Sequence, residues 1–463
     1  MTMTPSVMAA VCTWNPVTGN WGTASGWSCG SVPTGPALDT AIIGAASTVT
    51  VNSAQSIFTL NNAGSIDIDA FLLTLQGGGS TTNTGTINVG AGPIPNNAAL
   101  QVGAGHNINN TGGTINVSAD SVLNQFGSTI TGGVINTTGT GKLVAFNSGN
   151  NFLSGVTLAG TLDLASATGI ERVAGGLTLG GATINIGNNS IFAPQGDQTI
   201  GGSGTIVFAD ANANNRLNVE AGNLTLGAGI TVRGGNGVIG NQNFVGGGAT
   251  LTNNGTITAD TAGRSITIQV SGLTTNNGTL SALNGGTLNL NSAVTGSTGS
   301  QILAGAGSVV SQNGVTLSGD MNLTGAGSFR ANNSGNNFLS GVTLAGTLDL
   351  ASATGIERVA GGLTLGGATI NIGNNSIFAP QGDQTIGGSG TIVFADANAN
   401  NRLNVEAGNL TLGAGITVRG GNGVIGNQNF VGGGATLTNN GTITADTAGR
   451  SITIQVSGLT TNN

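Results

Sequence analysis

Short stretches of alternating apolar and polar residues recur along the chain, separated by Gly and Asn. The commonest form is a small residue, then Thr or Ser, then an apolar, a polar and a second apolar residue. Gly85-Thr86-Ile87-Asn88-Val89 and Gly113-Thr114-Ile115-Asn116-Val117 are two examples. Alternation over a few residues sends successive side chains to opposite faces, which indicates short β-strands.

The spacing of these strand phrases predicts how they are arranged. Their first apolar residues follow one another at steps of 20 to 28 residues, at Ile66, Ile87, Ile115, Ile135, Leu162, Ile184, Ile206, Ile230, Ile257 and Leu280. A step of this length suits one coil of a parallel β-solenoid, with two or three strands in each coil. We therefore expect an all-β fold of about 20–28 residues per coil. We also expect one stacked core row, formed by Ile66, Ile87, Ile115, Leu162, Ile184 and Ile206.

Asn-Asn and Asn-Gly pairs lie between the strand phrases. They occur at Asn61-Asn62, Asn109-Asn110, Asn188-Asn189, Asn253-Asn254-Gly255 and Asn276-Asn277-Gly278. Both residue types accept positive φ, so we expect them at the corners of the coils, where stacked Asn side chains can hydrogen-bond along the axis. The alternative is an antiparallel array with Asn-Gly hairpin turns, which would repeat its strands about every 8–12 residues.

A long duplication sets the organisation of the chain. Residues 147–277 and 333–463 are identical letter for letter, at an offset of 186. An exact copy of this size suits a modular rod that lengthens by adding units, and we expect a continuous solenoid over 46–463. The second copy stops at Asn463, whereas Asn277 continues into Gly278, so the chain is expected to be a piece of a longer repetitive protein.

Residues 1–45 differ from the remainder of the chain. They lack the repeated phrase and contain both cysteines, Cys12 and Cys29, and all three tryptophans, at positions 14, 21 and 27. We expect a capping segment with the tryptophans as its hydrophobic plug, since the first coil of a solenoid exposes a strand edge. Cys12 and Cys29 are candidates for a disulfide, and two reduced, buried thiols are the alternative. Met1–Ala10 is either the remnant of an export signal or an artificial start.

The composition excludes some classes of binding partner and of protein. The chain has 85 Gly among 463 residues and is 38% hydrophobic but only 6% charged, with 10 basic and 17 acidic residues. The single lysine is Lys142. No basic stripe for a phosphate backbone is available, so nucleic acid is not expected as a partner. No apolar run is long enough for a transmembrane helix.

No residue pattern points to catalysis, and we expect no catalytic, cofactor-binding or metal-binding residues. Asp67 and Asp69 share one face of a strand and are interpreted as a solvated outer pair. The lone His106 is expected to be a solvated loop residue. The charged residues Asp163, Glu171, Arg172, Asp197, Asp210, Arg216 and Glu220 recur in the second copy, from Asp349 to Glu406. They form no dense acidic cluster, so structural or surface roles are expected.

Two phrases resemble a known family of bacterial surface proteins. Leu251-Thr252-Asn253-Asn254-Gly255-Thr256-Ile257 and the similar run from Leu273 to Leu280 look like the strand repeats of filamentous-haemagglutinin-type adhesins and autotransporter passengers. The start, from Trp21 and Trp27-Ser28 to Asp39-Thr40-Ala41, is similar to the opening of such proteins.

The resemblance implies a right-handed parallel β-helix that is secreted or displayed at the bacterial cell surface. The expected function is that of a non-enzymatic stalk that mediates attachment or spacing. Its expected partner is a host or neighbouring-cell surface, through a glycan or protein receptor. The first alternative is a structural filament or surface-layer subunit that self-associates along or between rods. The second is a polysaccharide-degrading enzyme on the same fold.

Overall fold

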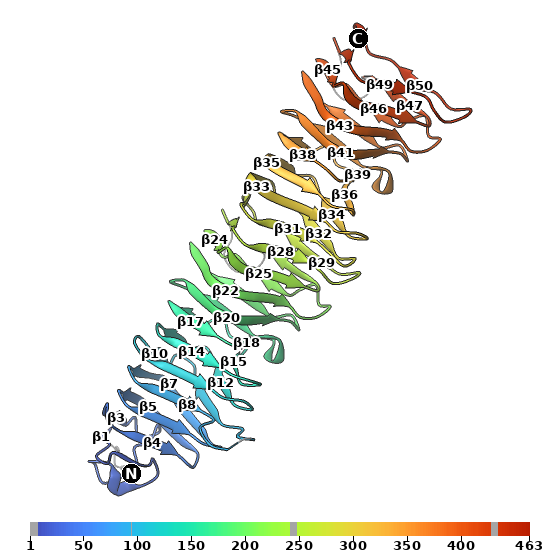
Figure 1. Ribbon diagram of the computed structural model, residues 1–463. Coiled ribbons are helices and arrows are strands. Elements are labelled where there is room, and N and C mark those ends of the chain that lie inside the picture. Colours follow the sequence, from blue (N-terminus) through green and yellow to red (C-terminus); the bar gives the residue numbers. More distant parts are fainter. Residues whose placement is uncertain (1–7, 94, 241–247, 427–433) are drawn as a thin grey trace, which may run out of the picture. The chain divides into compact units, whose positions relative to one another are not determined.

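The structure is a computed structural model that describes residues 8–93, 95–240, 248–426 and 434–463. Met1–Val7, most of the candidate export-signal remnant, therefore lies outside the described residues. Strands make up 56% of the chain and helices 2%, and the parallel strands stack as a β-solenoid of about 19 turns (Figure 1). This confirms the predicted all-β solenoid. Contacts divide the chain into an N-terminal unit, residues 1–231, and a C-terminal unit, residues 232–463.

Each turn of the N-terminal unit has three strand positions, which we call faces A, B and C. Face A contains β2 (Thr18–Asn20), β4 (Thr48–Val51), β6 (Ser65–Ile68), β8 (Thr86–Val89), β11 (Thr114–Val117), β14 (Val134–Thr137), β17 (Val156–Ala159), β20 (Leu177–Ile186), β22 (Gln198–Phe208) and β24 (Asn223–Leu226). Face B contains β5 (Gln55–Asn62), β7 (Leu72–Asn83), β9 (Ala99–Val102), β12 (Val122–Gln125), β15 (Lys142–Ala145), β18 (Thr161–Asp163) and the second parts of β20 and β22. Face C contains β1 (Val11–Thr13), β3 (Thr40–Ile43), the second parts of β5 and β7, β10 (Asn107–Asn109), β13 (Thr129–Thr131), β16 (Phe152–Ser154), β19 (Ile170–Val173), β21 (Ile191–Pro194) and β23 (Arg216–Leu217).

The C-terminal unit also has three faces, D, E and F. Face D contains β26 (Gly237–Ile239), β29 (Ser265–Ile268), β32 (Thr287–Leu290), β34 (Val309–Gln312), β36 (Ser328–Ala331), β39 (Thr347–Asp349), the second parts of β41 and β43, β46 (Gly415–Gly420) and β49 (Thr442–Thr444). Face E contains β27 (Thr250–Asn253), β30 (Thr274–Asn276), β33 (Val294–Ala304), β35 (Thr316–Thr324), β37 (Phe338–Ser340), β40 (Ile356–Val359), β42 (Ile377–Pro380), β44 (Arg402–Leu403), β47 (Gly423–Ile425) and β50 (Ile452–Ile454). Face F contains β28 (Thr256–Ala259), β31 (Thr279–Ala282), the second parts of β33 and β35, β38 (Val342–Leu344), β41 (Leu363–Ile372), β43 (Gln384–Phe394), β45 (Asn409–Leu412), β48 (Thr436–Asn439) and β51 (Thr460–Asn462).

The remaining elements are β25 (Gly229–Gly234), at the division between the units, and three short 3₁₀ turns. These turns are η1 (Ala24–Gly26), η2 (Ala165–Ala167) and η3 (Ala351–Ala353). None of the helices in the described part of the chain is both long and apolar enough to cross a membrane.

The segment expected to form a separate cap also supplies strands of the solenoid. β1 pairs with β3, and β2 pairs with β4 of the following turn. Because these pairings are parallel and in register, the first turn begins within residues 1–45.

The burial pattern follows the strand phrase. In β6, Ile66 and Ile68 are fully buried, whereas Ser65 and Asp67 lie at the surface. The same alternation occurs in β8, β11 and β14. Because apolar residues point inward from each face, the core is a column of Ile, Leu and Val between the faces.

The predicted single core row is wrong, although its six residues are all fully buried. Ile66, Ile87 and Ile115 do stack, but their row continues through Ile135 and Leu158 on face A. Leu162 lies on face B, where it pairs with Leu143 and Ile184. Only Gly160, with φ +104, separates β17 from β18, so this strand phrase belongs to the next face of the same turn.

The predicted asparagine ladders are confirmed. Asn62 donates to Asn83 at 2.7 Å, and Asn83 donates to Asn110 at 2.6 Å; all three side chains are buried. Asn188 and Asn189 have the predicted positive φ, at 52° and 66°, whereas the asparagines at 61–62, 109–110, 253–254 and 276–277 do not. The ladder asparagines therefore bind successive turns together along the axis without the predicted positive φ.

The duplicated segments adopt the same local structure. β19 and β40 have the same sequence and burial pattern, as do β20 and β41. The first turn of each copy differs, because Lys142 on β15 forms an ion pair with Asp163 at 2.7 Å and the equivalent of Lys142 is Ser328. This is the position where the sequences preceding the copies differ.

Identical strands nevertheless occupy different faces within the C-terminal unit. β27 and β48 have the same sequence, one offset of 186 residues apart. Strand pairing from β27 along face E leads to β47, whereas β48 lies on face F. The 186-residue offset therefore contains a whole number of turns plus one further strand, and β48 lies one face on from β27.

The last turn differs from its copy in exposure. β29 pairs with β26 and β32, and its Ile268 is fully buried, whereas β50 pairs with β47 and its Ile454 is 44% exposed. We expect amides near Thr460 to exchange with solvent much faster than those near Thr274, because each turn is protected by its neighbours. Hydrogen exchange by mass spectrometry would measure this, and equal protection at both places would show that another chain covers the last turn.

Candidate functional site

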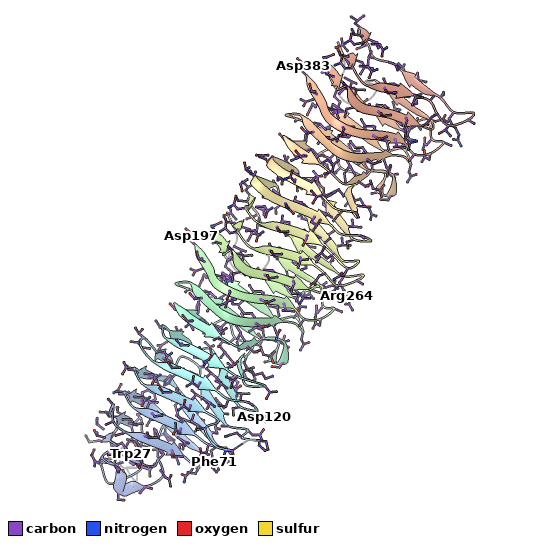
Figure 2. The ribbon with its side chains drawn as sticks, in the orientation of Figure 1. Trp27, Phe71, Asp120, Asp197, Arg264 and Asp383 are labelled. Carbon is purple, nitrogen blue, oxygen red and sulfur yellow. A yellow bond between two sulfur atoms is a disulfide. The ribbon has the colours of Figure 1, made fainter. Side chains whose placement is uncertain are left out.

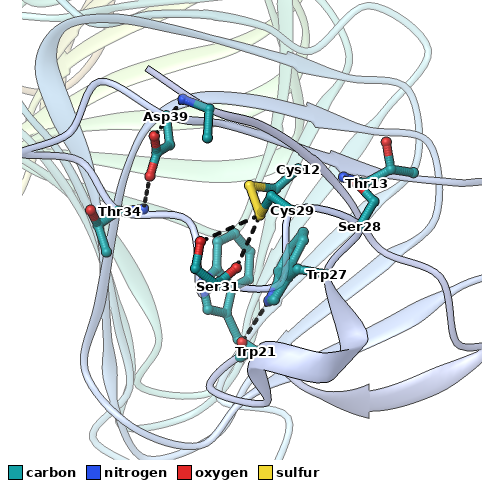
Figure 3. The surroundings of a disulfide bond; sticks show 10 residues. Cys12, Thr13, Trp21, Trp27, Ser28, Cys29, Ser31, Thr34 and Asp39 are labelled. Atoms are coloured by element: carbon teal, nitrogen blue, oxygen red, sulfur yellow. Dashed lines mark hydrogen bonds between the residues drawn. A yellow bond between two sulfur atoms is a disulfide. The ribbon is translucent and has the colours of Figure 1, made fainter. Parts of the chain in front are cut away.

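The N-terminal tryptophans form a closed aromatic cluster. Trp14 and Trp21 each contact the Trp27 ring edge-on, at 5.0 Å between ring centroids. The Trp27 indole N–H donates a hydrogen bond to the Trp21 carbonyl oxygen at 2.8 Å (Figure 3). With 4% or less of each side chain exposed, the rings form the expected plug and offer no face on which a sugar could stack.

A disulfide joins Cys12 of β1 to Cys29 beside this cluster, as the two residues were expected to pair (Figure 3). It ties the strand that starts the solenoid to the loop that carries Trp27. Asp39 secures the same segment, because its carboxylate accepts hydrogen bonds from the backbone N–H groups of Ala10 and Thr34.

Reducing this bond should loosen the first turn and leave later turns folded. A 17-residue separation corresponds to roughly 3 kcal/mol of loop-closure stabilisation. Hydrogen exchange with and without reductant should show lost protection in β1 and β2 alone. A Cys12→Ser/Cys29→Ser variant should behave like the reduced protein. Labelling of free thiols in the native, unreduced protein would contradict the bond.

The structure contradicts the solvated role expected for His106, whose side chain is fully buried. Its Nδ1 lies 2.7 Å from the Gln76 carbonyl oxygen, which can only accept, so Nδ1 carries the proton. Nε2 then accepts a hydrogen bond from the Thr81 hydroxyl at 2.9 Å. Burial lowers the pKa of His106, and the hydrogen bond to Gln76 opposes this only in part. The residue is a structural link between turns.

The recurring charged residues are buried more deeply than their sequence indicates. Glu171 and Glu220 are fully buried, and Arg172 lies 3.4 Å from the Glu220 carboxylate. In the second copy the equivalent Arg358–Glu406 distance is 3.5 Å. Desolvation raises the pKa of Glu220, and the Arg172 charge opposes it. The same geometry in both copies supports the expected structural role.

Other recurring carboxylates accept hydrogen bonds from the backbone at the surface. Asp197 and Asp383, the same residue in the two copies, are exposed, and both are labelled in Figure 2. Each accepts a hydrogen bond of 2.8 Å from a backbone N–H, of Asn223 and Asn409 respectively. Within the described ranges, no three His, Cys, Asp or Glu side chains gather closely enough to hold a metal ion.

A polar groove of about 510 Å³ lies on face A of the N-terminal unit, along the outer side of β6, β8, β11 and β14. β8 and β14 are labelled in Figure 1, in its blue-to-cyan part. The residues that line it are Asp67, Asn88, Gly90, Ala91, Asn116, Val117, Ser118, Asn136 and Thr138. None is aromatic or basic.

Four of these residues form a ladder across consecutive turns, because strand register aligns Asp67, Asn88, Asn116 and Asn136. Asn88 donates to the Asp67 carboxylate at 2.7 Å, and Asn116 donates to Asn88 at 2.8 Å. Asn136 then donates to Asn116 at a longer 3.5 Å.

The ladder gives the groove a repeated set of hydrogen-bonding groups. An amide nitrogen carries two N–H donors, and the ladder uses one of them in each asparagine. Asn88 also donates to the Ser65 hydroxyl at 3.4 Å, whereas the second N–H groups of Asn116 and Asn136 are available to a ligand or water along the half-buried rim. Asn136 lies opposite Ala159 in the strand register. Because the alanine methyl group cannot form a hydrogen bond, the ladder ends at Asn136. Asp67, which we interpreted as a solvated outer residue, is in fact the acceptor that anchors the ladder.

Sequence reasoning identified Asp67 and the strand phrase but did not recognise the groove. The signal was present: the residue that follows the isoleucine at the first buried position of the phrase is Asp or Asn in every one of these strands. It becomes a site only once the register shows that these strands are neighbours on one face. No model of a known protein family matches the chain, and no curated protein matches its sequence.

Proposed function

We propose that the chain is the non-enzymatic β-solenoid stalk of an adhesin-like protein, secreted or displayed at the bacterial cell surface. The observation that carries this proposal is the duplicated segment, which folds in the same way twice within a stack of parallel turns. Each turn contacts only its neighbours, so an added copy extends the stack without a change to the existing core. A stalk that attaches two surfaces or holds them apart needs a fold whose length can be extended in this way.

The polar surface supports attachment in preference to catalysis. A polysaccharide-degrading enzyme would need an acid and a base placed together on one face. The recurring glutamates at 171 and 220 are buried and one is paired with Arg172, so neither is presented to a polymer at the surface. The face A groove contains a single carboxylate, Asp67.

A filament or surface-layer subunit that self-associates along or between rods is the second candidate, since open strand edges are a template for pairing with another chain. The rotation between β27 and β48 argues against regular lateral packing, because the identical surface of each copy points in a different direction.

Electron microscopy of the full chain and of a chain ending at Asn277 tests the stalk. Deleting residues 147–332 leaves this same shorter sequence, so every retained residue keeps its chain neighbours. The shorter particle should lose roughly 35–45 Å of contour, one strand spacing of about 4.8 Å per turn removed. An unchanged contour would overturn the stalk, and long end-to-end particles would favour the filament.

Attachment is tested with beads coated with the full chain. We expect them to adhere to bacterial or mammalian cells more than beads coated with heat-unfolded chain. Equal adhesion of the two bead preparations to every cell type in the panel would refute an adhesin role, even if the particle is elongated.

A further inference from the structure

We propose that the groove on face A binds a linear, neutral oligosaccharide along the solenoid axis, through the Asp67–Asn88–Asn116–Asn136 ladder. The proposal is independent of the stalk in its physical basis and rests on the proposed function only for its biological purpose. It assigns a ligand class and a location to the attachment surface.

The spacing of the ladder fits a sugar chain. Neighbouring strands lie about 4.8 Å apart, so the ladder amides repeat at that interval along the groove, and Asn116 and Asn136 each keep a second N–H for a ligand. One pyranose ring of an extended β-linked chain has nearly this length, so each ring can present a hydroxyl oxygen to one amide. An extended peptide repeats its side chains on one face about every 6.6–6.8 Å and would lose register with the ladder.

The order of the hydrogen bonds defines two ends of the groove. The amide donors of Asn88, Asn116 and Asn136 all point toward Asp67, so the ladder begins with a carboxylate that can accept a ligand O–H. A charged acceptor gives a stronger hydrogen bond than a neutral one. At the other end Ser118 and Thr138 add hydroxyl groups that both donate and accept.

The charge of the groove selects against acidic sugars. Its lining contains the Asp67 carboxylate and no Arg or Lys, so a uronic acid, sialic acid or sulfate group would meet repulsion without a compensating cation. Since no aromatic residue lines the groove, affinity must come from hydrogen bonds that compete with water. Binding is therefore expected in the millimolar to high micromolar range and to require several consecutive sugar rings.

The test is isothermal titration calorimetry of the full chain with a panel of hexasaccharides. The neutral probes are cellohexaose, laminarihexaose, mannohexaose and chitohexaose, and hexagalacturonate is the acidic probe. At least one neutral probe should bind, its disaccharide should bind at least about tenfold more weakly, and hexagalacturonate should not bind.

Asn88→Thr/Asn116→Thr removes two carboxamides and keeps residues that favour strands. The double variant should weaken binding roughly tenfold or more and leave circular dichroism and the melting temperature close to those of the parent. The matched control is Asn289→Thr on β32, which removes an outward asparagine that donates to Thr267 away from the groove. This control should bind like the parent.

Two outcomes would overturn the proposal: no neutral hexasaccharide binds at millimolar concentration, or the double variant binds as well as the parent. Preferred binding of hexagalacturonate would also overturn it. Adhesion of coated beads distinguishes failure of the sugar-binding proposal from failure of the stalk proposal. If bead attachment persists in Asn88→Thr/Asn116→Thr while sugar binding is lost, the attachment surface lies elsewhere and the proposed stalk still stands.

Discussion

Replacing Asn83 by alanine should destabilise the surrounding turns by about 2–4 kcal/mol. Asn83 is fully buried, accepts from Asn62 and donates to Asn110 at 2.6 Å, and its amide also reaches the Thr114 carbonyl oxygen. The substitution removes these bonds and leaves a buried amide and a buried oxygen without their partner. It also opens a small cavity, which adds to the cost.

Hydrogen exchange across β5, β7 and β10 is the appropriate measurement, because a stack of turns can open locally without unfolding as a whole. Asn88→Thr is the control, since it removes a ladder asparagine on the outer side of the next strand, where water can replace the lost bond. We expect its effect to stay within about 0.5 kcal/mol. Equal effects for the two variants would show that the buried ladder does not stabilise the fold.

Glu171 and Glu357 are equivalent residues of the two copies, and both are fully buried. Desolvation raises the pKa of each well above its usual value, and for Glu357 the nearby Gln312 amide opposes this in part. Neither carboxyl oxygen of Glu171 has a hydrogen-bond partner among the residues that the structure describes.

The raised pKa gives these residues a defined pH dependence. Below about pH 4.5, the ordinary value, both the folded and unfolded forms carry the proton, and the contribution to stability is fully present. It is lost as pH rises through the higher pKa of the folded form, because only the unfolded chain can release the proton freely. Burial of His106 acts in the opposite direction, since its stability contribution is lost as pH falls below about 6.5.

Glu171→Gln should therefore raise the free energy of unfolding at neutral pH and above, by about 1–3 kcal/mol, and change it little at pH 4. Glu357→Gln should have the same sign. Urea unfolding at several pH values, with exchange protection of β19 and β40 as local readouts, would measure both. Destabilisation at high pH by either variant would show that the carboxylate is ionised and needed in the folded protein.

Much of the fold could be predicted from the sequence, because a coil-length step and strand alternation are both properties of the chain itself. The buried residues Ile66, Ile115 and Leu162 were identified correctly on this basis. Their assignment to a single row failed because all three faces use the same strand phrase. Nothing in the phrase Gly160-Thr161-Leu162-Asp163 shows that it follows β17 around one corner and does not begin a new turn.

The environments of polar residues were harder to predict. His106 and Glu171 have flanking residues typical of a surface, yet both are fully buried, because turns above and below cover them. Those turns are more than a dozen residues away in sequence: Thr81 lies opposite His106, and Phe192 lies opposite Glu171. The groove was missed for the same reason, since its four ladder residues come from four different turns.

The one-face offset between β27 and β48 has a consequence for how such a chain can grow. β48 lies on the face next to that of β27, which has the same sequence, and its Leu437 is fully buried, as Leu251 of β27 is. Faces E and F of the turn thus accept the same peptide. A gene duplication need not match the helical period to yield a folded product; any whole number of strands suffices. If a third copy followed at the same offset, it would be shifted by one more face. Each of the three faces of the turn would then carry one copy of each surface motif.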